Sequence, residues 1–221
     1  MERILEPELM DDPEQALAYS KADFSTAHGA RVQIFRAAYP QLDLSGAVLD
    51  LGCGSGDVLL RFARAYPAAR FYGLDGSRPM LELAHSAIDA EPALKSRVEL
   101  LFGIIPEGPI PTRPWQLIMS HSLLHQLHQP QVLWRTIREQ GAKGCAVFVA
   151  DLRRPPSEVE ARRVVSVTSK DEPEILQRDF YNSLCAAFEP EEVRRQLTQA
   201  GLPQLEVKMH DPFHLTVQGF L

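Results

Sequence analysis

Hydrophobic and polar residues alternate along the chain in two distinct patterns. Short apolar runs, each followed by a turn or loop signal, are typical of buried strands and occupy residues 47–51, 70–74, 98–102, 115–120 and 145–151. Between these runs, apolar residues recur with a helical period over residues 57–66, 79–88 and 130–140. Apolar strands separated by amphipathic helices predict a parallel sheet covered on both faces, and therefore an α/β fold.

The two ends of the chain depart from this alternation. Residues 14–38 have a helical pattern, so we expect residues 1–40 to form an N-terminal helical cap. Residues 152–200 contain helical stretches without a strand, and we expect residues 152–190 to be an insert or lid over the carboxyl edge of the sheet. Alternating residues on either side of Asp211-Pro212 predict a final antiparallel hairpin. Without a repeat or a linker, residues 1–221 are expected to form a single domain.

Charge and composition narrow the classes of partner. The chain has 221 residues, with 23 Lys+Arg against 29 Asp+Glu, a net charge of −6. An excess of acid disfavours a nucleic-acid partner, whose binding relies on neutralising phosphates. A membrane span is not expected either, because uncharged stretches stay well below the roughly 18 residues that one needs. The mixed charges of the first 15 residues do not resemble a signal peptide, so a cytoplasmic protein is expected.

Three cysteines, Cys53, Cys145 and Cys185, are widely spaced, and two of them lie in apolar runs. This arrangement predicts buried free thiols rather than a disulfide framework or a zinc site.

The residues that point to chemistry are the glycines of the segment VLDLGCGSGD. Gly52, Gly54 and Gly56 follow a buried strand directly and precede a helix. Glycines in such a turn let the backbone approach a ligand with no Cβ in the way. Asp75 lies nineteen residues past Gly56, where doubly wound folds place the carboxylate that accepts hydrogen bonds from a ribose. The loop therefore predicts a nucleotide-type ligand.

The spacing of the glycines distinguishes two cofactor classes. A dinucleotide fingerprint reads G-x-G-x-x-G, whereas this loop reads G-x-G-x-G, with Asp50 two residues before the first glycine. A carboxylate there would repel a pyrophosphate but suits a ligand with ammonium and sulfonium groups. The charges favour S-adenosylmethionine.

The stretches VLDLGCGSG and FYGLDGS resemble the class I S-adenosylmethionine-dependent methyltransferases. The resemblance continues through WQLIMSHSLLHQL, similar to that family's fourth strand and the start of the next helix, and through EEVRRQLTQAGL and the final hairpin, so that it covers roughly residues 15–221. It implies a Rossmann-like, seven-stranded, mostly parallel sheet with one antiparallel strand. It also implies a ligand at the carboxyl ends of the first two strands and direct in-line methyl transfer, with S-adenosyl-L-homocysteine as the product.

Carried over by position, the resemblance assigns parts of the cofactor to individual residues. Gly52 and Gly54 would contact the methionyl part, Asp50 its ammonium group, and Asp75 the ribose hydroxyls. The remaining residues expected at the cofactor are Leu74, Gly76 and Met80 beside the adenine, Cys53 and Ser120, and Tyr19 and Phe24 closing over it from the N-terminal helices. Core packing is the alternative for Tyr19 and Phe24.

The adenine subsite departs from the family pattern. Many relatives have an acidic residue after the third strand, whereas this chain reads Leu101-Phe-Gly-Ile-Ile105. We therefore expect the adenine to pack on Phe102 or Ile104.

Three histidines, His121, His125 and His128, would share one face if the segment were a continuous helix. No acidic residue joins the set, so no metal is expected. His121 follows the fourth strand, where the family delivers a residue next to the transferring methyl group. It is therefore a candidate catalytic base, and His125 a candidate substrate contact; a structural role is the alternative for both.

Candidate acceptor contacts lie in the helical insert. Arg153 and Arg154 directly follow the fifth strand and form a guanidinium pair suited to a carboxylate or phosphate, although solvated charges are the alternative. Further on, Tyr181 is predicted as a catalytic residue and Asn182 as a substrate contact. The expected function is methyl transfer to O, N or C of a small molecule, an anionic one being among the candidates, by a monomer or homodimer. The alternatives are a methyltransferase of protein or RNA, a non-catalytic binder of the cofactor, and a nicotinamide enzyme.

Overall fold

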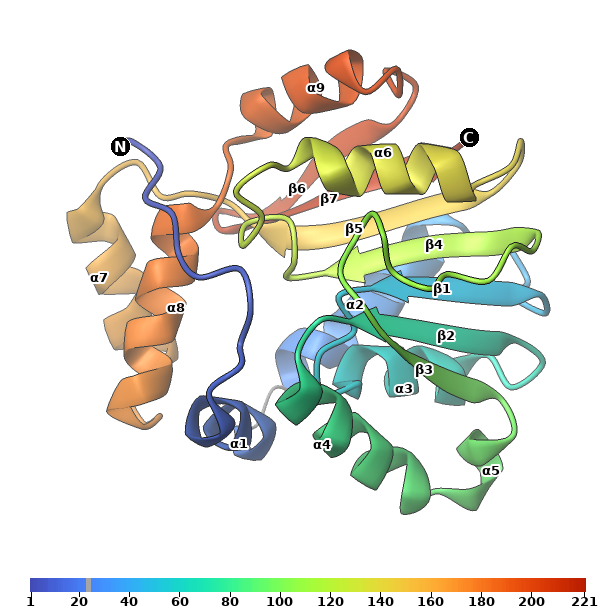
Figure 1. The fold of residues 1–221 in the computed structure, drawn as a ribbon. Helices are drawn as coiled ribbons and strands as arrows, with labels where there is room; N and C mark the ends of the chain where they lie inside the picture. The colour runs from blue at the N-terminus through green and yellow to red at the C-terminus, as the bar shows by residue number, and fades with distance from the viewer. Residues whose placement is uncertain (23–24) are drawn as a thin grey trace.

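Seven strands form one sheet in the computed structural model, which describes residues 1–22 and 25–221 (Figure 1). Their order across the sheet is β3-β2-β1-β4-β5-β7-β6. Their bounds are β1 Ala47–Leu51, β2 Arg70–Asp75, β3 Val98–Phe102, β4 Trp115–His121, β5 Ala146–Leu152, β6 Glu206–Asp211 and β7 His214–Phe220. The five predicted strands and the final hairpin are confirmed, with bounds that differ by one residue at most.

Strand β7 runs opposite to the other six strands of the sheet. It pairs antiparallel with both β5 and β6, whereas the pairs among β1 to β5 are all parallel. The turn between β6 and β7 includes Asp211-Pro212, as predicted; Asp211 Oδ1 accepts a hydrogen bond from Phe213 N at 2.8 Å. This hairpin places His214 opposite Leu152, the last residue of β5.

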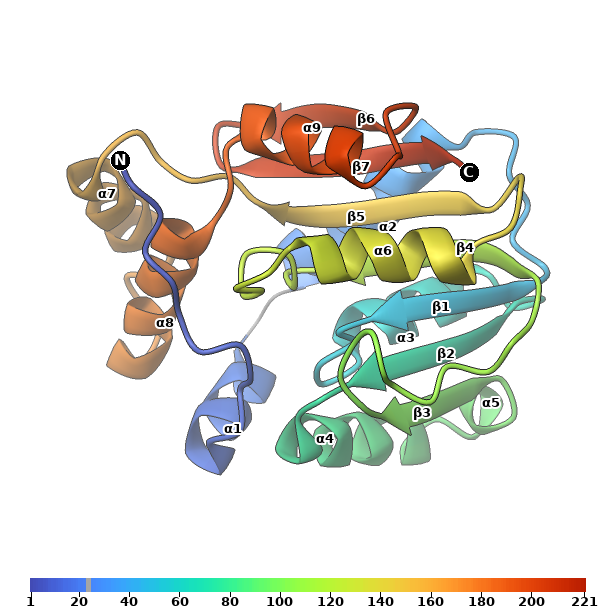
Figure 2. The same ribbon diagram turned by 45° about the horizontal axis from the view of Figure 1, so that its top comes forward.

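Helices cover both faces of the sheet, as the alternating pattern predicts. The helices are α1 Pro13–Lys21, α2 Ser25–Ala38, α3 Asp57–Ala65, α4 Arg78–Asp89, α5 Pro92–Lys95, α6 Gln131–Gln140, α7 Glu158–Thr168, α8 Glu174–Ala186 and α9 Pro190–Gln199. On one face α2, α3 and α4 bury a core that includes Phe35, Phe62 and Phe148. On the other, α6 and α9 pack around Trp134 (Figure 2).

Helix α3 illustrates why these segments form where they do. Gly56 adopts a φ of 80° and ends the loop from β1, and the helix then buries Val58, Leu59, Leu60, Phe62 and Ala63. Burying one large apolar side chain contributes about 1.5–3 kcal/mol, so this face fixes α3 against the sheet. The start of α3 is thereby held beside the glycine loop.

The N-terminal region only partly matches the expected helical cap. Residues 1–12 form no helix and run past the α8 end toward α1 (Figure 1). Ile4 N donates to Cys185 O at 3.1 Å, and Ser77 Oγ donates to Met10 O at 2.7 Å. We call residues 1–12 the N-terminal strap. Helix α2, by contrast, covers a face of the sheet, because Val32 and Phe35 are buried in its core.

Helices α7 and α8 follow β5 and lie beyond the carboxyl edge of the sheet (Figures 1 and 2). They pack on each other through a small apolar cluster that includes Val164 and Leu184. No helix in the described part of the chain is long and apolar enough to cross a membrane.

Candidate cofactor and acceptor site

The strand order reverses direction between β1 and β4, which are neighbours although β2 follows β1 in the chain. The segments that leave these two strands therefore diverge, and open α/β sheets bind ligands in the crevice at such a point. Here the two segments are the glycine loop, residues 52–56, and the loop of residues 122–130.

The glycine loop holds three left-handed residues, with φ values of 76°, 53° and 80° at Gly52, Gly54 and Gly56. Only glycine adopts this conformation without strain, which explains the alternation of glycines in the sequence. A Cβ on Gly54 would contact only Met80 Cε, at 3.5 Å, so the protein itself leaves this side of the loop open. A Cβ on Gly52 would lie 3.0 Å from the Leu123 side chain, which closes the other end.

Asp75 ends β2 and faces the glycine loop. Its Oδ2 accepts a hydrogen bond from Gly54 N at 2.7 Å, and its Oδ1 accepts one from Ser77 N at 2.8 Å. Burial raises the pKa of Asp75, although these two backbone donors act against the rise. Each carboxylate oxygen has a second lone pair, so the group can still accept from a ligand hydroxyl while it holds the loop.

Asp50 lies beneath the loop with a buried oxygen that lacks a partner. The residue is 1% exposed, and no hydrogen-bond donor in the described residues reaches Oδ1. The Nδ1 atom of the His121 ring lies 3.8 Å from it. A buried carboxylate without a donor is unfavourable, so this site fits a ligand that brings a positive charge. The ammonium group of S-adenosylmethionine meets that requirement.

His121 itself is 9% exposed and packs against the rings of Phe62 and Phe148, at 5.7 Å between centroids in both cases. Neither ring nitrogen has a hydrogen-bond partner among the described residues. Burial lowers the pKa of His121 although Asp50 opposes this, which favours a neutral imidazole. The next residue, Ser122, has a φ of 54°, a strained conformation for a non-glycine residue that often occurs at functional sites. A neutral imidazole with two open nitrogens is suited to the predicted role of base, which no contact here tests.

The expected adenine wall combines residues from three segments. Phe102 and Ile104 after β3 are 45% and 54% exposed, and the Arg78 guanidinium lies 3.9 Å from the Phe102 ring centroid. A Cβ on Gly76 would lie 2.8 Å from both Ile104 Cγ1 and Leu9 Cδ2. Leu9 comes from the strap, and no sequence pattern indicated that the strap reaches this wall.

Two predicted cofactor residues have structural contacts of their own. The Cys53 side chain packs over Gly73, where a Cβ would lie 2.8 Å from its sulfur, and Cys53 N donates to Leu74 O at 3.0 Å. Ser120 Oγ donates to Leu51 O at 2.7 Å. Cys53, like Cys145 and Cys185, is a buried free thiol, as predicted, and burial raises its pKa. The Cys53 thiol and the Ser120 hydroxyl thus brace the loop.

The segment that contains His121, His125 and His128 is not a continuous helix, so the three histidines do not share one helical face. Residues 122–130 form an irregular loop between β4 and α6, because α6 begins only at Gln131. His125 is buried in this loop, with Nδ1 2.5 Å from Asp151 Oδ1 and Nε2 3.3 Å from Glu6 Oε1. His128 Nε2 lies 2.7 Å from Glu6 O. The histidines therefore connect the loop to β5 and to the strap.

Electrostatics support a charged His125. Burial acts to lower the pKa of His125, but the Asp151 carboxylate outweighs it and the pKa rises. The pKa of Asp151 is lowered in turn: burial would raise it, but the charge and hydrogen bond of His125 prevail. Asp151 and Glu6 were missed by sequence reasoning, because only the fold brings residues so far apart in the chain together.

Arg153 and Arg154 are already paired with acids of the protein. Arg153 Nε donates to Glu189 Oε2 and Arg154 Nη2 to Glu192 Oε1, both at 2.9 Å. They join the end of β5 to the start of α9. A substrate role, which stays a prediction, would require these pairs to open.

Tyr181 and Asn182 lie on α8. Tyr181 Oη donates to Glu158 Oε2 at 3.1 Å, and the Arg162 guanidinium lies 4.7 Å from its ring centroid, so its observed contacts are with α7. Asn182 is half-buried and directly precedes Ser183, whose Oγ donates to Glu6 Oε2 at 3.3 Å. Their acceptor roles stay predictions.

Of the two N-terminal aromatic residues, Tyr19 is half-buried in α1, where burial raises its pKa to about 12. Phe24 lies outside the described residues. Within those residues, no group of three or more His, Cys, Asp or Glu side chains is arranged to hold a metal ion.

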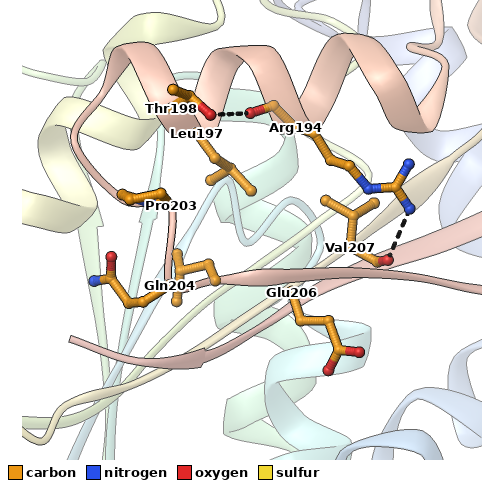
Figure 3. Close-up of a pocket in the computed structure, with 8 residues that line it drawn as sticks. Arg194, Leu197, Thr198, Pro203, Gln204, Glu206 and Val207 are labelled. Atoms are coloured by element: carbon orange, nitrogen blue, oxygen red, sulfur yellow. Dashed lines mark hydrogen bonds between the residues drawn. The ribbon is translucent and has the colours of Figure 1, made fainter.

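A surface groove between α9 and β6 is lined by Arg194, Leu197, Thr198 and Val207, among others (Figure 3). Strand β6 is at the edge of the sheet, with β7, β5 and β4 between it and β1. The groove is therefore separate from the glycine loop.

Comparison with known proteins agrees with this geometry. Residues 48–144 match the sequence model of a family described as Methyltransferase domain. An uncharacterized methyltransferase of Schizosaccharomyces pombe is 28% identical over 87 residues, which are 38% of this chain and 31% of that protein. The match thus spans less than a third of the length of this relative.

Solved structures share the fold across nearly the whole chain. The plantazolicin methyltransferase BpumL, in complex with SAH, has a TM-score of 0.71 at 14% identity, over 94% of this chain and 90% of that one. A SAM-dependent methyltransferase from Aquifex aeolicus has a TM-score of 0.68 at 16% identity, over 94% and 97%. At these identities the likeness concerns the fold. The residues that match the Methyltransferase domain model include the whole glycine loop and Asp75.

Proposed function

We propose that the protein transfers a methyl group from S-adenosylmethionine to O, N or C of a small molecule. The observation that carries the proposal is the buried Asp50 oxygen without a donor, beneath a glycine loop that Asp75 holds open. The domain family and the cofactor-bound neighbours of the same fold support the choice of cofactor.

The residues of this chain would divide the cofactor among them. Asp50 would pair with its ammonium group, the backbone of Gly52 and Gly54 would line its methionyl part, and Asp75 would accept from the ribose hydroxyls. Met80, Phe102 and Ile104 would pack on the adenine. When bound, S-adenosylmethionine supplies a methyl group already activated by its sulfonium charge.

The protein's own contribution is to orient the acceptor and exclude water. His121 would take a proton from an acceptor that arrives protonated; its two ring nitrogens without a partner and its lowered pKa support this role. The strap is held by hydrogen bonds to α8 and to Ser77, and it would help to exclude water from the bound cofactor.

A compact acceptor is supported by the surroundings of the site. The strap, α1, α7 and α8 gather beyond the carboxyl edge of the sheet, which disfavours a long polymer (Figure 1). One neighbour of the same fold, the plantazolicin methyltransferase BpumL, has a crystal structure in complex with a triazolic desmethylPZN analog and SAH.

Transfer of labelled methyl groups tests the proposal. The protein would be incubated with [methyl-¹⁴C]S-adenosylmethionine and a cell extract, which is then separated into small-molecule, protein and RNA fractions. We expect label in the small-molecule fraction. Label confined to the protein or RNA fraction would refute the acceptor class, and cofactor binding without any transfer would refute the enzymatic role.

A further inference from the structure

Arg31 is a buried arginine near the crevice that makes none of the contacts described above for the cofactor and acceptor site. It lies on α2, is 7% exposed as a whole residue, and its guanidinium has no hydrogen bond or ion pair with the side chains and backbone groups that the structure describes. The other buried arginine of the site, Arg154, is bound by Glu192 and by Ala187 O. The Arg31 nitrogens are not among the fully buried atoms that lack a partner, so a ligand can reach them. A guanidinium that is largely withdrawn from water and has no partner in the protein gains free energy when an anionic ligand pairs with it.

The position of Arg31 along α2 can be worked out from the far end of that helix. Tyr39 Oη donates to Val147 O near the start of β5, and Phe35, one turn earlier, packs against Phe148, the next residue of β5, at 5.4 Å between ring centroids, so α2 runs opposite to β5. Arg31 precedes Tyr39 by eight residues, about 12 Å at the helical rise. Asp151 follows Val147 by four residues, about 13 Å along the strand. Arg31 therefore lies level with Asp151, at the carboxyl edge of the sheet.

The charges that face Arg31 agree with this placement. Burial lowers its pKa, and Asp151, Asp211 and Tyr19 act to raise it. In turn, the positive charge of Arg31 acts to lower the pKa values of His121 and His214. Arg31 is thus among groups from the ends of β4, β5, β6 and β7.

The two nearby carboxylates are already engaged. Asp151 is bound by His125 Nδ1 and by the backbone N–H groups of Leu124 and Leu152. Asp211 is bound by His214 Nδ1 and by Phe213 N. The Asp151 and Asp211 carboxylates therefore stabilise the positive charge of Arg31 from a distance, and the N–H groups of its guanidinium stay available to a ligand. A single guanidinium among acids suits a monoanion better than a dianionic phosphate, because the acids repel the second charge.

We propose that Arg31 binds a carboxylate of the acceptor and so selects carboxylic acids as substrates. A guanidinium presents parallel N–H donors that match a carboxylate in two hydrogen bonds. The assignment replaces Arg153 and Arg154 as the anion site, since acids of the protein hold both of those. The assignment of a substrate rests on the proposed methyl transfer. The preference of the protein for a carboxylate ligand can be measured even if no methyl group is transferred.

The donor's own carboxylate is the competing partner for Arg31. Phe35, one turn along α2 from Arg31, packs against Phe148 of β5 with 5.4 Å between the ring centroids, whereas Asp50 and Asp75, which mark the donor, lie in β1 and β2. This placement of α2 over β5 favours the acceptor side of the crevice.

The test uses the full-length protein loaded with S-adenosylhomocysteine, with benzoate and its uncharged analogue benzamide as probes. By calorimetry or NMR titration, we expect benzoate to bind at least tenfold more tightly than benzamide. Arg31→Gln should abolish the preference, and Arg31→Lys should restore part of it. Arg36→Gln, which removes the same charge from an exposed position of α2, should keep it.

The outcomes separate the possible failures. Equal binding of the two probes to the wild type, or a preference that survives Arg31→Gln, overturns the proposal. A tenfold loss of S-adenosylhomocysteine affinity in Arg31→Gln would assign the guanidinium to the donor and also overturn it. Failure of the wild type to bind S-adenosylhomocysteine would instead refute the proposed function, and the probe preference could still be measured.

Discussion

The two halves of the crevice are built in different ways. The donor half, around the glycine loop, comes mainly from residues 50–80, with Phe102 and Ile104 at the adenine wall, and its loop is oriented by hydrogen bonds such as Gly54 N to Asp75 Oδ2. The acceptor half gathers the strap, α2, the loop after β4 and the end of β5, and it is held by side-chain charges such as His125 and Asp151. Ligand affinity at the donor half should therefore be most sensitive to substitutions that change the shape of the loop. The stability of the acceptor half should be most sensitive to substitutions that remove a charge and to pH.

The largest change in cofactor affinity is expected for a substitution at Gly54. Gly54→Ala adds a Cβ that meets little within the protein but occupies the space of the methionyl group, so the affinity for S-adenosylhomocysteine should fall about 100-fold, equivalent to about 2.7 kcal/mol. Gly144→Ala is the matched control, because Gly144 also has a positive φ, 88°, with nothing within 4 Å of an added Cβ. Equal affinities of the two variants in calorimetry would show that the loop does not contact the ligand.

The second largest change in cofactor affinity is expected for a substitution at Asp75. Asp75→Asn removes the charge that strengthens hydrogen bonds from ribose hydroxyls, and it turns a donor toward a backbone N–H, so affinity should fall about 10- to 100-fold. Because Asp75 also binds Gly54 N and Ser77 N, a modest loss of stability should accompany it. Asp89→Asn, at an exposed ion pair with Lys95, is the control. Unchanged affinity in Asp75→Asn would contradict the ribose assignment.

The third effect tests the strap. Arg3 donates to Ala186 O, His125 O and Leu127 O, and its guanidinium lies 3.9 Å from the Phe188 ring centroid. Arg3→Gln should lower the free energy of unfolding by about 2 kcal/mol, measured with urea. The exposed Arg178→Gln should change it by less than about 0.5 kcal/mol. A similar small change for Arg3→Gln would mean that the strap is not fixed to the acceptor half.

The smallest effect concerns pH. The pKa of His125 is raised in the folded protein, so its contribution to stability is complete below the unfolded value of about 6.5 and disappears as pH rises through the folded value. The stability difference between wild type and His125→Gln should therefore shrink from pH 6 to pH 9. His85→Gln, on an exposed position of α4, should lack this dependence. A difference independent of pH would mean that His125 is not charged.

The difference between local contacts in the donor half and long-range contacts in the acceptor half also explains which parts of the site the sequence could predict. Gly52, Gly54, Asp50 and Asp75 lie close together in the chain, and their roles follow from local geometry, so the strands and the donor loop were predicted almost to the residue. Predictions for the acceptor half were weaker because its contacts join residues over a hundred positions apart, such as Glu6 and His125.

Two particular errors have physical reasons. The histidines were treated as a possible helical face, but strained Ser122 and the ties of His125 and His128 to Asp151 and to the strap hold this segment as a loop. The strap has no helical or strand period, since its order comes from hydrogen bonds to distant carbonyls. No local pattern encodes such contacts.

Calorimetric titration of the full-length protein with S-adenosylhomocysteine and, separately, with NAD most directly tests whether the crevice binds the S-adenosylmethionine class of cofactor rather than a dinucleotide. We expect one molecule of S-adenosylhomocysteine to bind per chain, with affinity reduced in Asp75→Asn, and no measurable binding of NAD. Binding of NAD in preference to S-adenosylhomocysteine would contradict the account.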